Sequence, residues 1–379
     1  MAGANKITTH IDAVLALARP DILSLRAYSH AEWNPALERL HANESPMRNP
    51  ADTSTQGLNR YPEPQPRALV ERLALLYDVL PERLLVGRGS DEAIDLIVRA
   101  FCRAAVDAVL ICPPTFGMYA VAARIQGADV IEVPLLAGHG FALDVDAVLR
   151  AVTPSVKIVF LCTPNNPTGT VLAQRDIERL VAALAGRAIA VVDEAYIEFS
   201  QQASLVKALA DNPHLVILRT LSKFHGLAGA RVGSLLAHSQ LIELLRKIIP
   251  PYAIAQSTVE VTLNALTPES LRMAHERGAL IVSERETLRA ALSGAAGVLR
   301  VWPSEANFLL VEFADPQRVL AAIADAGLLV RDARGYAGLS HALRLTIGTH
   351  EQNRRLLAAI TEAVEAPRNN LTTSTRAHG

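Results

Sequence analysis

A series of short apolar runs, separated by segments with helical periodicity, constrains the fold of this chain more than any other feature. The runs are continuously apolar rather than alternating, which is typical of strands covered on both faces of a sheet. They are Leu84–Val86, Ala108–Cys112, Val130–Val133, Ile158–Cys162, Ala188–Val192, Leu215–Leu218 and Val232–Ala237. Alternating strand and helix patterns predict an α/β fold with a mostly parallel central sheet and helices on both faces.

The pattern changes after Tyr252. A long helix is expected from Pro268 to about Ser293, with proline at the first helical position. Residues 349–352 (Thr-His-Glu-Gln) are a capping box that begins the last helix. Between these helices lie the strand-like runs Phe308–Val311, Leu328–Val330 and Leu343–Ile347.

These patterns predict four segments along the chain. A large domain spans residues 44–252 and a small α+β domain spans residues 253–365. We expect the irregular segment of residues 1–43 to pack on the small domain. The polar residues 366–379 are expected to form a disordered tail.

Composition and charge exclude several classes of protein. Among 379 residues, 37 Lys and Arg balance 38 Asp and Glu, so bulk charge predicts neither nucleic-acid binding nor attachment to an anionic membrane. The three cysteines form no CxxC pair, which argues against a zinc site and a disulfide framework and for a reducing compartment. Since no run resembles a secretory signal or a membrane span, we expect a soluble cytoplasmic protein without a metal.

Ligands of open α/β sheets bind beyond the carboxyl ends of the strands, so the polar residues that follow each run are the candidates. Residues 87–91 (Gly-Arg-Gly-Ser-Asp) follow the first run and open a helix. Glycines allow close approach of the backbone, and the helix N-terminus at Ser90 and Asp91 presents N–H groups to an anion. A capped turn without a ligand is the alternative interpretation.

Two further runs end in polar residues. Residues 163–169 (Thr-Pro-Asn-Asn-Pro-Thr-Gly) form an irregular turn that holds the side chains of Asn165 and Asn166 at the sheet edge, with a rigid loop without a ligand as the alternative. Asp193 ends another run, with Tyr196 three residues later. A carboxylate at the end of a buried strand is costly unless a cation or donor meets it, although an N-cap role is an equal alternative.

A lysine follows the run Leu215–Leu218. Ser222 and Lys223 come just after it, and Arg231 lies eight residues beyond the lysine. A lone lysine is most often a solvated surface charge. At a ligand-binding strand end, however, its amine can be desolvated and become a nucleophile.

The ordered set of Asn166, Asp193, Tyr196, Lys223 and Arg231 resembles the cofactor-binding set of fold-type I pyridoxal-phosphate aminotransferases. The motifs are Asn-Pro-Thr-Gly, Asp-Glu-Ala-Tyr, and Ser-Lys followed by Gly-Leu-Ala-Gly-x-Arg-x-Gly. Further stretches, from about Tyr28 to about Ile360, are similar to the histidinol-phosphate aminotransferase family. These are residues 43–44, 59–62, 112–119, 193–199 and 343–349.

The resemblance implies pyridoxal 5'-phosphate as the cofactor and a role for each matching residue. The residue matching Lys223 bonds covalently to the cofactor and then moves a proton as general base and acid. Asp193 matches the carboxylate that pairs with the ring nitrogen. Asn166 and Tyr196 match donors to the ring hydroxyl oxygen, and Phe116 matches the aromatic residue that stacks on the ring, often a tyrosine in relatives.

The resemblance also implies a phosphate site and a partner subunit. The cofactor phosphate would lie at the helix opened by Ser90 and Asp91, with Ser222 and Arg231 adding a donor and a charge. Tyr61 matches a tyrosine that reaches this phosphate from the partner subunit, so a homodimer is expected.

Substrate residues follow in the same way. Arg344 matches the arginine that binds the α-carboxylate of glutamate by a bidentate fork. Arg331 and Tyr28 match residues near the substrate phosphate, and Asn43 matches a substrate-binding asparagine. The implied reaction converts L-histidinol phosphate and 2-oxoglutarate to imidazole acetol phosphate and glutamate, reversibly, in L-histidine biosynthesis.

One departure and three alternatives stay open. Phe224 and His225 stand where relatives often have alanine and phenylalanine, which bears on substrate preference. The nearest alternatives are an aromatic amino-acid aminotransferase of the same family and a threonine-phosphate decarboxylase. An alternative of another class is a catalytically silent regulator with the same fold.

Overall fold

The computed structural model describes residues 10–28, 34 and 36–365. The chain divides into two compact units. The large unit comprises residues 1–282 and 303–307, and the small unit comprises residues 283–302 and 308–379. Among the described residues, no helix is long and apolar enough to cross a membrane.

The large unit is built on a seven-stranded sheet that confirms the predicted α/β class. The strand order is β1-β7-β6-β5-β4-β2-β3. Neighbours from β6 across to β3 are parallel, and β7 alone runs antiparallel to both of its neighbours. The strands are β1 (Leu84–Gly87), β2 (Ala108–Ile111), β3 (Asp129–Glu132), β4 (Val156–Cys162), β5 (Ile189–Asp193), β6 (Leu215–Thr220) and β7 (Gly233–Leu236).

All seven predicted runs contain or overlap a strand, but one is not covered on both faces. Strand β3 lies at the edge of the sheet, and its residues are exposed or half-buried. The strands in the middle are almost wholly buried, as in β5 and β6. Continuous apolar runs therefore identified interior strands correctly and overestimated the burial of this edge.

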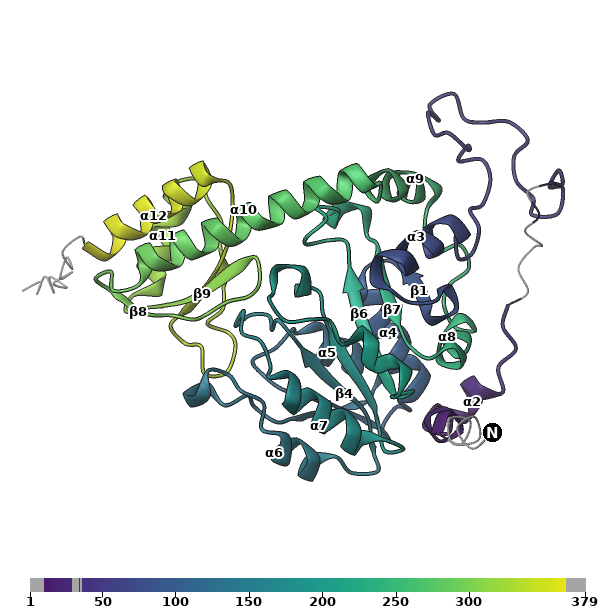
Figure 1. Cartoon of the computed structure of the whole chain (residues 1–379), viewed down its shortest axis with the longest axis horizontal. Helices are drawn as coiled ribbons and strands as arrows, with labels where there is room; N and C mark the ends of the chain where they lie inside the picture. Colours follow the sequence, from purple (N-terminus) through teal and green to yellow (C-terminus); the bar gives the residue numbers. More distant parts are fainter. Residues whose placement is uncertain (1–9, 29–33, 35, 366–379) are drawn as a thin grey trace, which may run out of the picture. The chain divides into compact units, whose positions relative to one another are not determined.

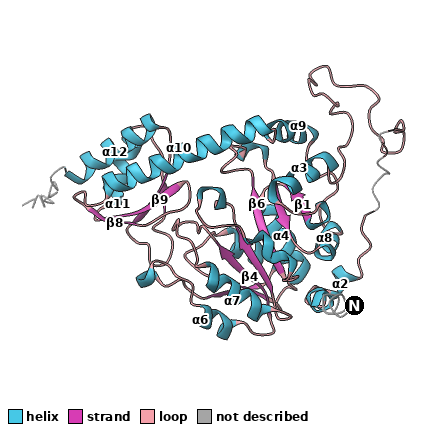
Figure 2. Ribbon diagram, viewed as in Figure 1, coloured by secondary structure: helices cyan, strands magenta, loops and turns pink. Residues whose placement is uncertain are grey.

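Helices cover both faces of this sheet (Figures 1 and 2). One face carries a core that α4 dominates, together with α5 and α8. On the other face α7 packs on β5. The helices are α2 (Pro20–Leu23), α3 (Arg67–Tyr77), α4 (Ser90–Phe101), α5 (Met118–Gln126), α6 (Val145–Ala151), α7 (Gln174–Leu184), α8 (Ser239–Arg246), α9 (Gln256–Ala265) and α10 (Pro268–Leu292).

The prediction that residues 1–43 pack on the small domain is wrong for the N-terminal helix. Ile11, Val14 and Ala18 are buried in the core of the large unit. The backbone N–H of Arg19 donates to the carbonyl oxygen of Ala100, 2.9 Å away. The apolar face of this helix therefore packs in the core that contains α4, and not on the small domain.

The division between the units also differs from the predicted boundary at residue 252. Helix α9 and the first part of α10 belong to the large unit, and the division falls within α10 after Val282. The single long helix that the proline signal predicted therefore contributes to both units. The predicted tail, residues 366–379, lies outside the described residues.

The small unit contains a four-stranded antiparallel sheet in the order β10-β11-β9-β8. Its strands are β8 (Val298–Val301), β9 (Phe308–Phe313), β10 (Arg331–Asp332) and β11 (Ala342–Thr346), with helices α11 (Pro316–Asp325) and α12 (His350–Glu365). Two predicted strands are confirmed, at β9 and β11. The run Leu328–Val330 is not a strand, because pairing begins only at the next residue, and β8 was not predicted.

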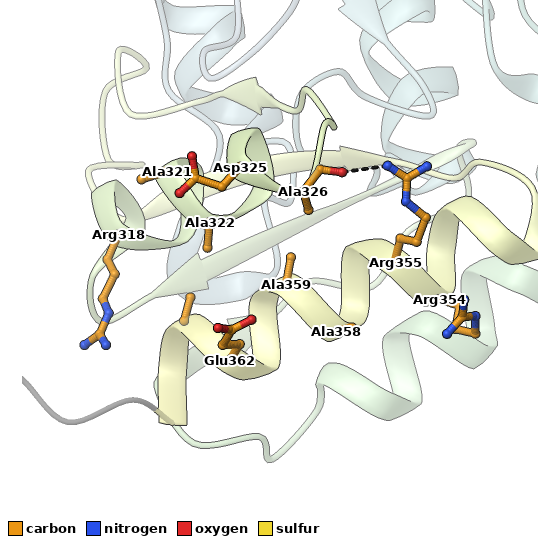
Figure 3. Close-up of a pocket in the computed structure, with 11 residues that line it drawn as sticks. Arg318, Ala321, Ala322, Asp325, Ala326, Arg354, Arg355, Ala358, Ala359 and Glu362 are labelled. Atoms are coloured by element: carbon orange, nitrogen blue, oxygen red, sulfur yellow. Dashed lines mark hydrogen bonds between the residues drawn. The ribbon is translucent and has the colours of Figure 1, made fainter.

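The last helix begins at the predicted capping box. The backbone N–H of Gln352 donates to Thr349 Oγ1 at 3.3 Å, and the N–H of Thr349 donates to Gln352 Oε1 at 2.9 Å. Figure 3 shows the groove between α11 and α12, whose floor is made of alanines such as Ala322 and Ala359. Small side chains at these positions let the two helices approach closely.

We predict that Gly233→Ala destabilises the protein by about 1–3 kcal/mol. Its Cβ would lie 2.2 Å from the carbonyl carbon of Gly89, which is backbone and cannot rotate away. Gly138→Ala is the matched control, since nothing lies within 4 Å of its Cβ. Urea unfolding of both variants is the measurement, and an equal midpoint for the two would contradict this account of the β1–β7 junction.

Candidate active site

The carboxyl ends of three adjacent strands deliver the predicted residues to one edge of the sheet. Cys162, the last residue of β4, pairs in register with Asp193, the last residue of β5. Asp193 in turn pairs with Leu218 of β6. The loops that carry Asn166 and Lys223 therefore start beside Asp193, as expected for one ligand site.

Asp193 is a carboxylate in a nearly dry environment. Its exposed fraction is 2%. The Tyr119 hydroxyl donates to Oδ2 at 2.7 Å, and the backbone N–H of Ala195 donates to Oδ1 at 3.1 Å. Burial raises the pKa of Asp193 to about 6, against the lowering effect of these two hydrogen bonds. Both donors are neutral, so the carboxylate is well suited to a cationic ligand atom.

Tyr119, on α5, is a site residue that sequence reasoning missed. Its ring stacks on Phe160 at a centroid distance of 4.6 Å, and Phe116 meets it edge-on at 5.6 Å. Burial, and then the nearby Asp193 carboxylate, raise the pKa of Tyr119 well above its usual value, so its hydroxyl keeps its proton. The available signal was its place three residues after Phe116, within a motif already singled out.

The structure brings Lys223 and Tyr196 together as predicted. Lys223 Nζ lies 5.8 Å from the centroid of the Tyr196 ring. The ammonium also lowers the pKa of Asp193, a smaller influence than burial. Lys223, Tyr196 and Asp193 therefore lie close together at the ends of β5 and β6, where the ammonium acts on the carboxylate.

The loop that carries Asn166 is fixed by its neighbour. Asn165 Nδ2 donates to the carbonyl oxygen of Pro114 at 2.8 Å and to Thr168 Oγ1 at 2.9 Å. Thr115 Oγ1 donates to Asn165 Oδ1 at 3.0 Å. Asn166 itself is buried. Of the two adjacent asparagines, Asn165 serves as the internal brace, and Asn166 remains the candidate for ligand contact.

Four predicted residues converge at the N-terminus of α4. Arg231 Nη2 lies 3.0 Å from Asp91 Oδ2, and Nη1 lies 3.3 Å from Ser222 Oγ. Gly89, which precedes Ser90, has φ +79°, and a Cβ there would lie 2.5 Å from Arg231 Nη2. A guanidinium, a hydroxyl and free helix N–H groups around a glycine cradle suit a phosphate group.

Tyr61 lies in an irregular loop of residues 36–66 that contains no helix or strand and precedes α3 (Figure 1). The buried Glu44 carboxylate organises it. Its oxygens lie 3.2 Å from Arg39 and 3.0 Å from Arg60, and it accepts the backbone N–H of Tyr61 at 2.6 Å. The half-exposed Tyr61 ring stacks on Tyr252 at 4.6 Å.

Asn43, within this loop, and Tyr28 are both exposed. Asn43 has φ +56°, in the left-handed region, and directly precedes Glu44. Tyr28 lies at the end of the described N-terminal residues. The roles given to Tyr28, Asn43 and Tyr61 by the resemblance stay predictions.

Arg331 and Arg344 are direct partners across β10 and β11 of the small unit. Directly opposed residues of antiparallel strands project on the same face, so two cationic side chains share one patch. Arg344 Cζ lies 5.1 Å from the Phe308 ring centroid. The neighbouring Asp332 is engaged by Arg334 at 2.7 Å, and the Arg334 hydrogen bond lowers the pKa of Asp332 to about 2. The paired arginines therefore place two positive charges on one face of this sheet.

We predict that Asp193→Asn changes how the stability of the cofactor-free protein depends on pH. Because the native pKa lies above the unfolded value, the contribution of Asp193 to wild-type stability is most favourable in acid and falls as pH rises from about 4 to about 6. Asparagine removes this contribution, so the variant should gain about 2 kcal/mol relative to wild type between pH 4.5 and 7.5. Urea unfolding at both pH values is the measurement, and a constant difference would contradict the buried-carboxylate assignment.

Comparisons with known proteins identify the family of this chain. Residues 28–360 match the family Aminotransferase class I and II. A protein named histidinol-phosphate aminotransferase from Stenotrophomonas maltophilia is 50% identical over 355 residues, covering 92% of this chain and 97% of that protein. One of the same name from Xanthomonas euvesicatoria pv. vesicatoria is 47% identical, covering 93% and 98%.

A solved structure shows the same fold. The histidinol-phosphate aminotransferase from Sinorhizobium meliloti, determined in complex with pyridoxal-5'-phosphate, matches with a TM-score of 0.73 at 24% identity. The match covers 81% of this chain and 83% of that one. The family match over most of the chain, together with the amine, carboxylate and anion cradle at one sheet edge, shows that this chain belongs to the class I and II aminotransferases.

Proposed function

We propose that this aminotransferase transfers an amino group between L-histidinol phosphate and 2-oxoglutarate, with pyridoxal 5'-phosphate as cofactor, in histidine biosynthesis. The observation that carries the substrate assignment is the register pairing of Arg331 with Arg344. Arg344 suits the α-carboxylate of glutamate, and histidinol phosphate, which has no carboxylate, can place its phosphate on Arg331. An uncharged aromatic side chain offers no anionic group for Arg331. Relatives at 47–50% identity bear the corresponding name.

The residues of the large unit fit the cofactor. Asp193 is a buried carboxylate with neutral donors only, which suits a protonated ring nitrogen. The cradle of Gly89, Ser222 and Arg231 at the N-terminus of α4 suits the phosphate. Pyridoxal phosphate, when bound, supplies an aldehyde for amines and an electron-withdrawing ring.

Each side chain of this site has its own role in the reaction. Lys223 Nζ supplies the amine that links to the cofactor and, once displaced by a substrate amine, takes up and returns the proton of the substrate's amino-bearing carbon. Asp193 holds the ring nitrogen in its protonated form, and Tyr119 orients that carboxylate. Asn166 and Tyr196 donate to the ring oxygen, and Phe116 covers the ring.

Substrate binding is assigned to the small unit and the N-terminal region. Arg344 takes the α-carboxylate of glutamate as a bidentate fork, and Arg331 takes the phosphate of histidinol phosphate. Tyr28 and Asn43 contribute from the N-terminal region. Since both substrates are anionic, one paired-arginine patch serves them in turn.

A homodimer completes the proposal. The loop of residues 36–66 exposes large apolar side chains, among them Leu40 at 92% and Met47 at 78%. Such a concentration on one loop is typical of a surface that another chain covers. We assign Tyr61 to the phosphate site of the partner subunit, and we place the enzyme in the cytoplasm.

The proposal predicts a strong preference for the phosphorylated amine. With 2-oxoglutarate as acceptor, kcat/KM for histidinol phosphate should exceed that for phenylalanine by at least about 100-fold, the worth of a charged contact of roughly 3 kcal/mol. Steady-state kinetics with both donors is the measurement. Comparable turnover of the two, or preference for phenylalanine, would favour the aromatic alternative.

Substitutions of Arg344 and Arg331 should raise KM for different substrates. Arg344→Lys should raise KM for glutamate more than for histidinol phosphate, because an ammonium cannot reproduce the bidentate fork. Arg331→Lys should do the reverse. Each variant is the other's control, since both keep the charge of the patch. Equal effects of both variants on both substrates would show that the assignment of roles is wrong.

A further inference from the structure

Helix α10 contains a buried glycine far from either end. Gly278 lies within Pro268–Leu292 and is buried, whereas its neighbour Ala279 is exposed. Glycine destabilises a helix interior relative to alanine. A glycine at position 278 is therefore expected where a neighbouring group leaves no room for a side chain.

The ring of Phe224 provides that reason. A Cβ at position 278 would lie 2.2 Å from Phe224 Cε2 and 2.7 Å from Cζ. Ordinary contacts of a Cβ begin at 3.4 Å, so even one methyl group would have to displace the ring or the helix by about 1.2 Å. The aromatic ring therefore rests directly on the helix backbone.

The Phe224 ring has little room to move aside. Phe199 and His275 meet it edge-on, each at a centroid distance of 5.2 Å. His225 follows on the chain and lies at 5.4 Å, also edge-on. The three aromatic groups and Gly278 enclose the ring, and all belong to the large unit.

We propose that Phe224 and Gly278 are a size-matched pair that positions Lys223. Phe224 is the next residue after the lysine, so a shift of its backbone moves the Cα from which the amine projects. The Phe224 ring occupies the space that a side chain at position 278 would fill. This inference rests on the assignment of Lys223 as the cofactor-linking amine, and it makes Phe224 and Gly278 positioning residues that act through Lys223.

A double-mutant cycle tests the contact without any substrate. In cofactor-free protein, Gly278→Ala should lower Tm by several degrees, although alanine favours a helix. Phe224→Leu removes Cε2 and Cζ, and in that background Gly278→Ala should instead raise Tm. Ala279→Gly, on the exposed side of the same turn, reports helix propensity alone. If Gly278→Ala raises Tm in both backgrounds, the pair does not exist.

The positioning role needs a readout that a purely structural contact would not move. With pyridoxal phosphate bound, we expect Gly278→Ala to shift the pH midpoint of the cofactor's absorbance change by at least half a pH unit. Phe224→Leu/Gly278→Ala should bring it back toward wild type. An unchanged midpoint in a folded Gly278→Ala variant would reduce the pair to packing and overturn the proposal.

This readout also separates the inference from the proposed function. Neither the Tm cycle nor the absorbance titration requires histidinol phosphate, so a different amino donor would leave both results standing. If Lys223→Ala protein shows the same cofactor absorbance band as wild type, the assignment of Lys223 itself is wrong. Where Phe224→Leu fails to fold, Phe224→Met, which is unbranched and flexible, replaces it in the same cycle.

Discussion

The hydrogen bond from Tyr119 to Asp193 is the constraint around which the site is organised. It ties α5 to the end of β5, and it fixes a carboxylate in a place where water does not stabilise it. An isolated buried charge is tolerated when a function requires it. Lys223, Tyr196 and the Asn166 loop are arranged around this carboxylate by the parallel register of β4, β5 and β6.

Much of this arrangement could be predicted from sequence because it depends on local patterns. Buried parallel strands are continuously apolar, and the polar residues that end them are easy to recognise, as Asp193 and Lys223 illustrate. The capping box at Thr349 is equally local. These features can be recognised from the sequence alone because the residues that define them are neighbours on the chain.

What could not be predicted depends on residues far apart in sequence. Tyr119 is 74 residues from Asp193, and the residues around Tyr119 do not indicate that its hydroxyl donates to this carboxylate. The helix that carries Ile11 and Val14 is amphipathic, but its pattern does not say which surface covers it. The pairing of Arg331 with Arg344 likewise needed the register of β10 and β11, since β10 is too short to have a pattern.

The closed loop behind Tyr61 has a consequence for how the enzyme can change over evolution. Because Glu44 ties Arg39 to Arg60, the backbone on either side of residues 45–59 is clamped at its base. The entropy lost on closing a flexible loop grows only with the logarithm of its length. Insertions or deletions between Glu44 and Thr55, where the backbone of Thr55 and Gln56 is held by Glu260, should therefore be tolerated while the aromatic ring of Tyr61 stays in place.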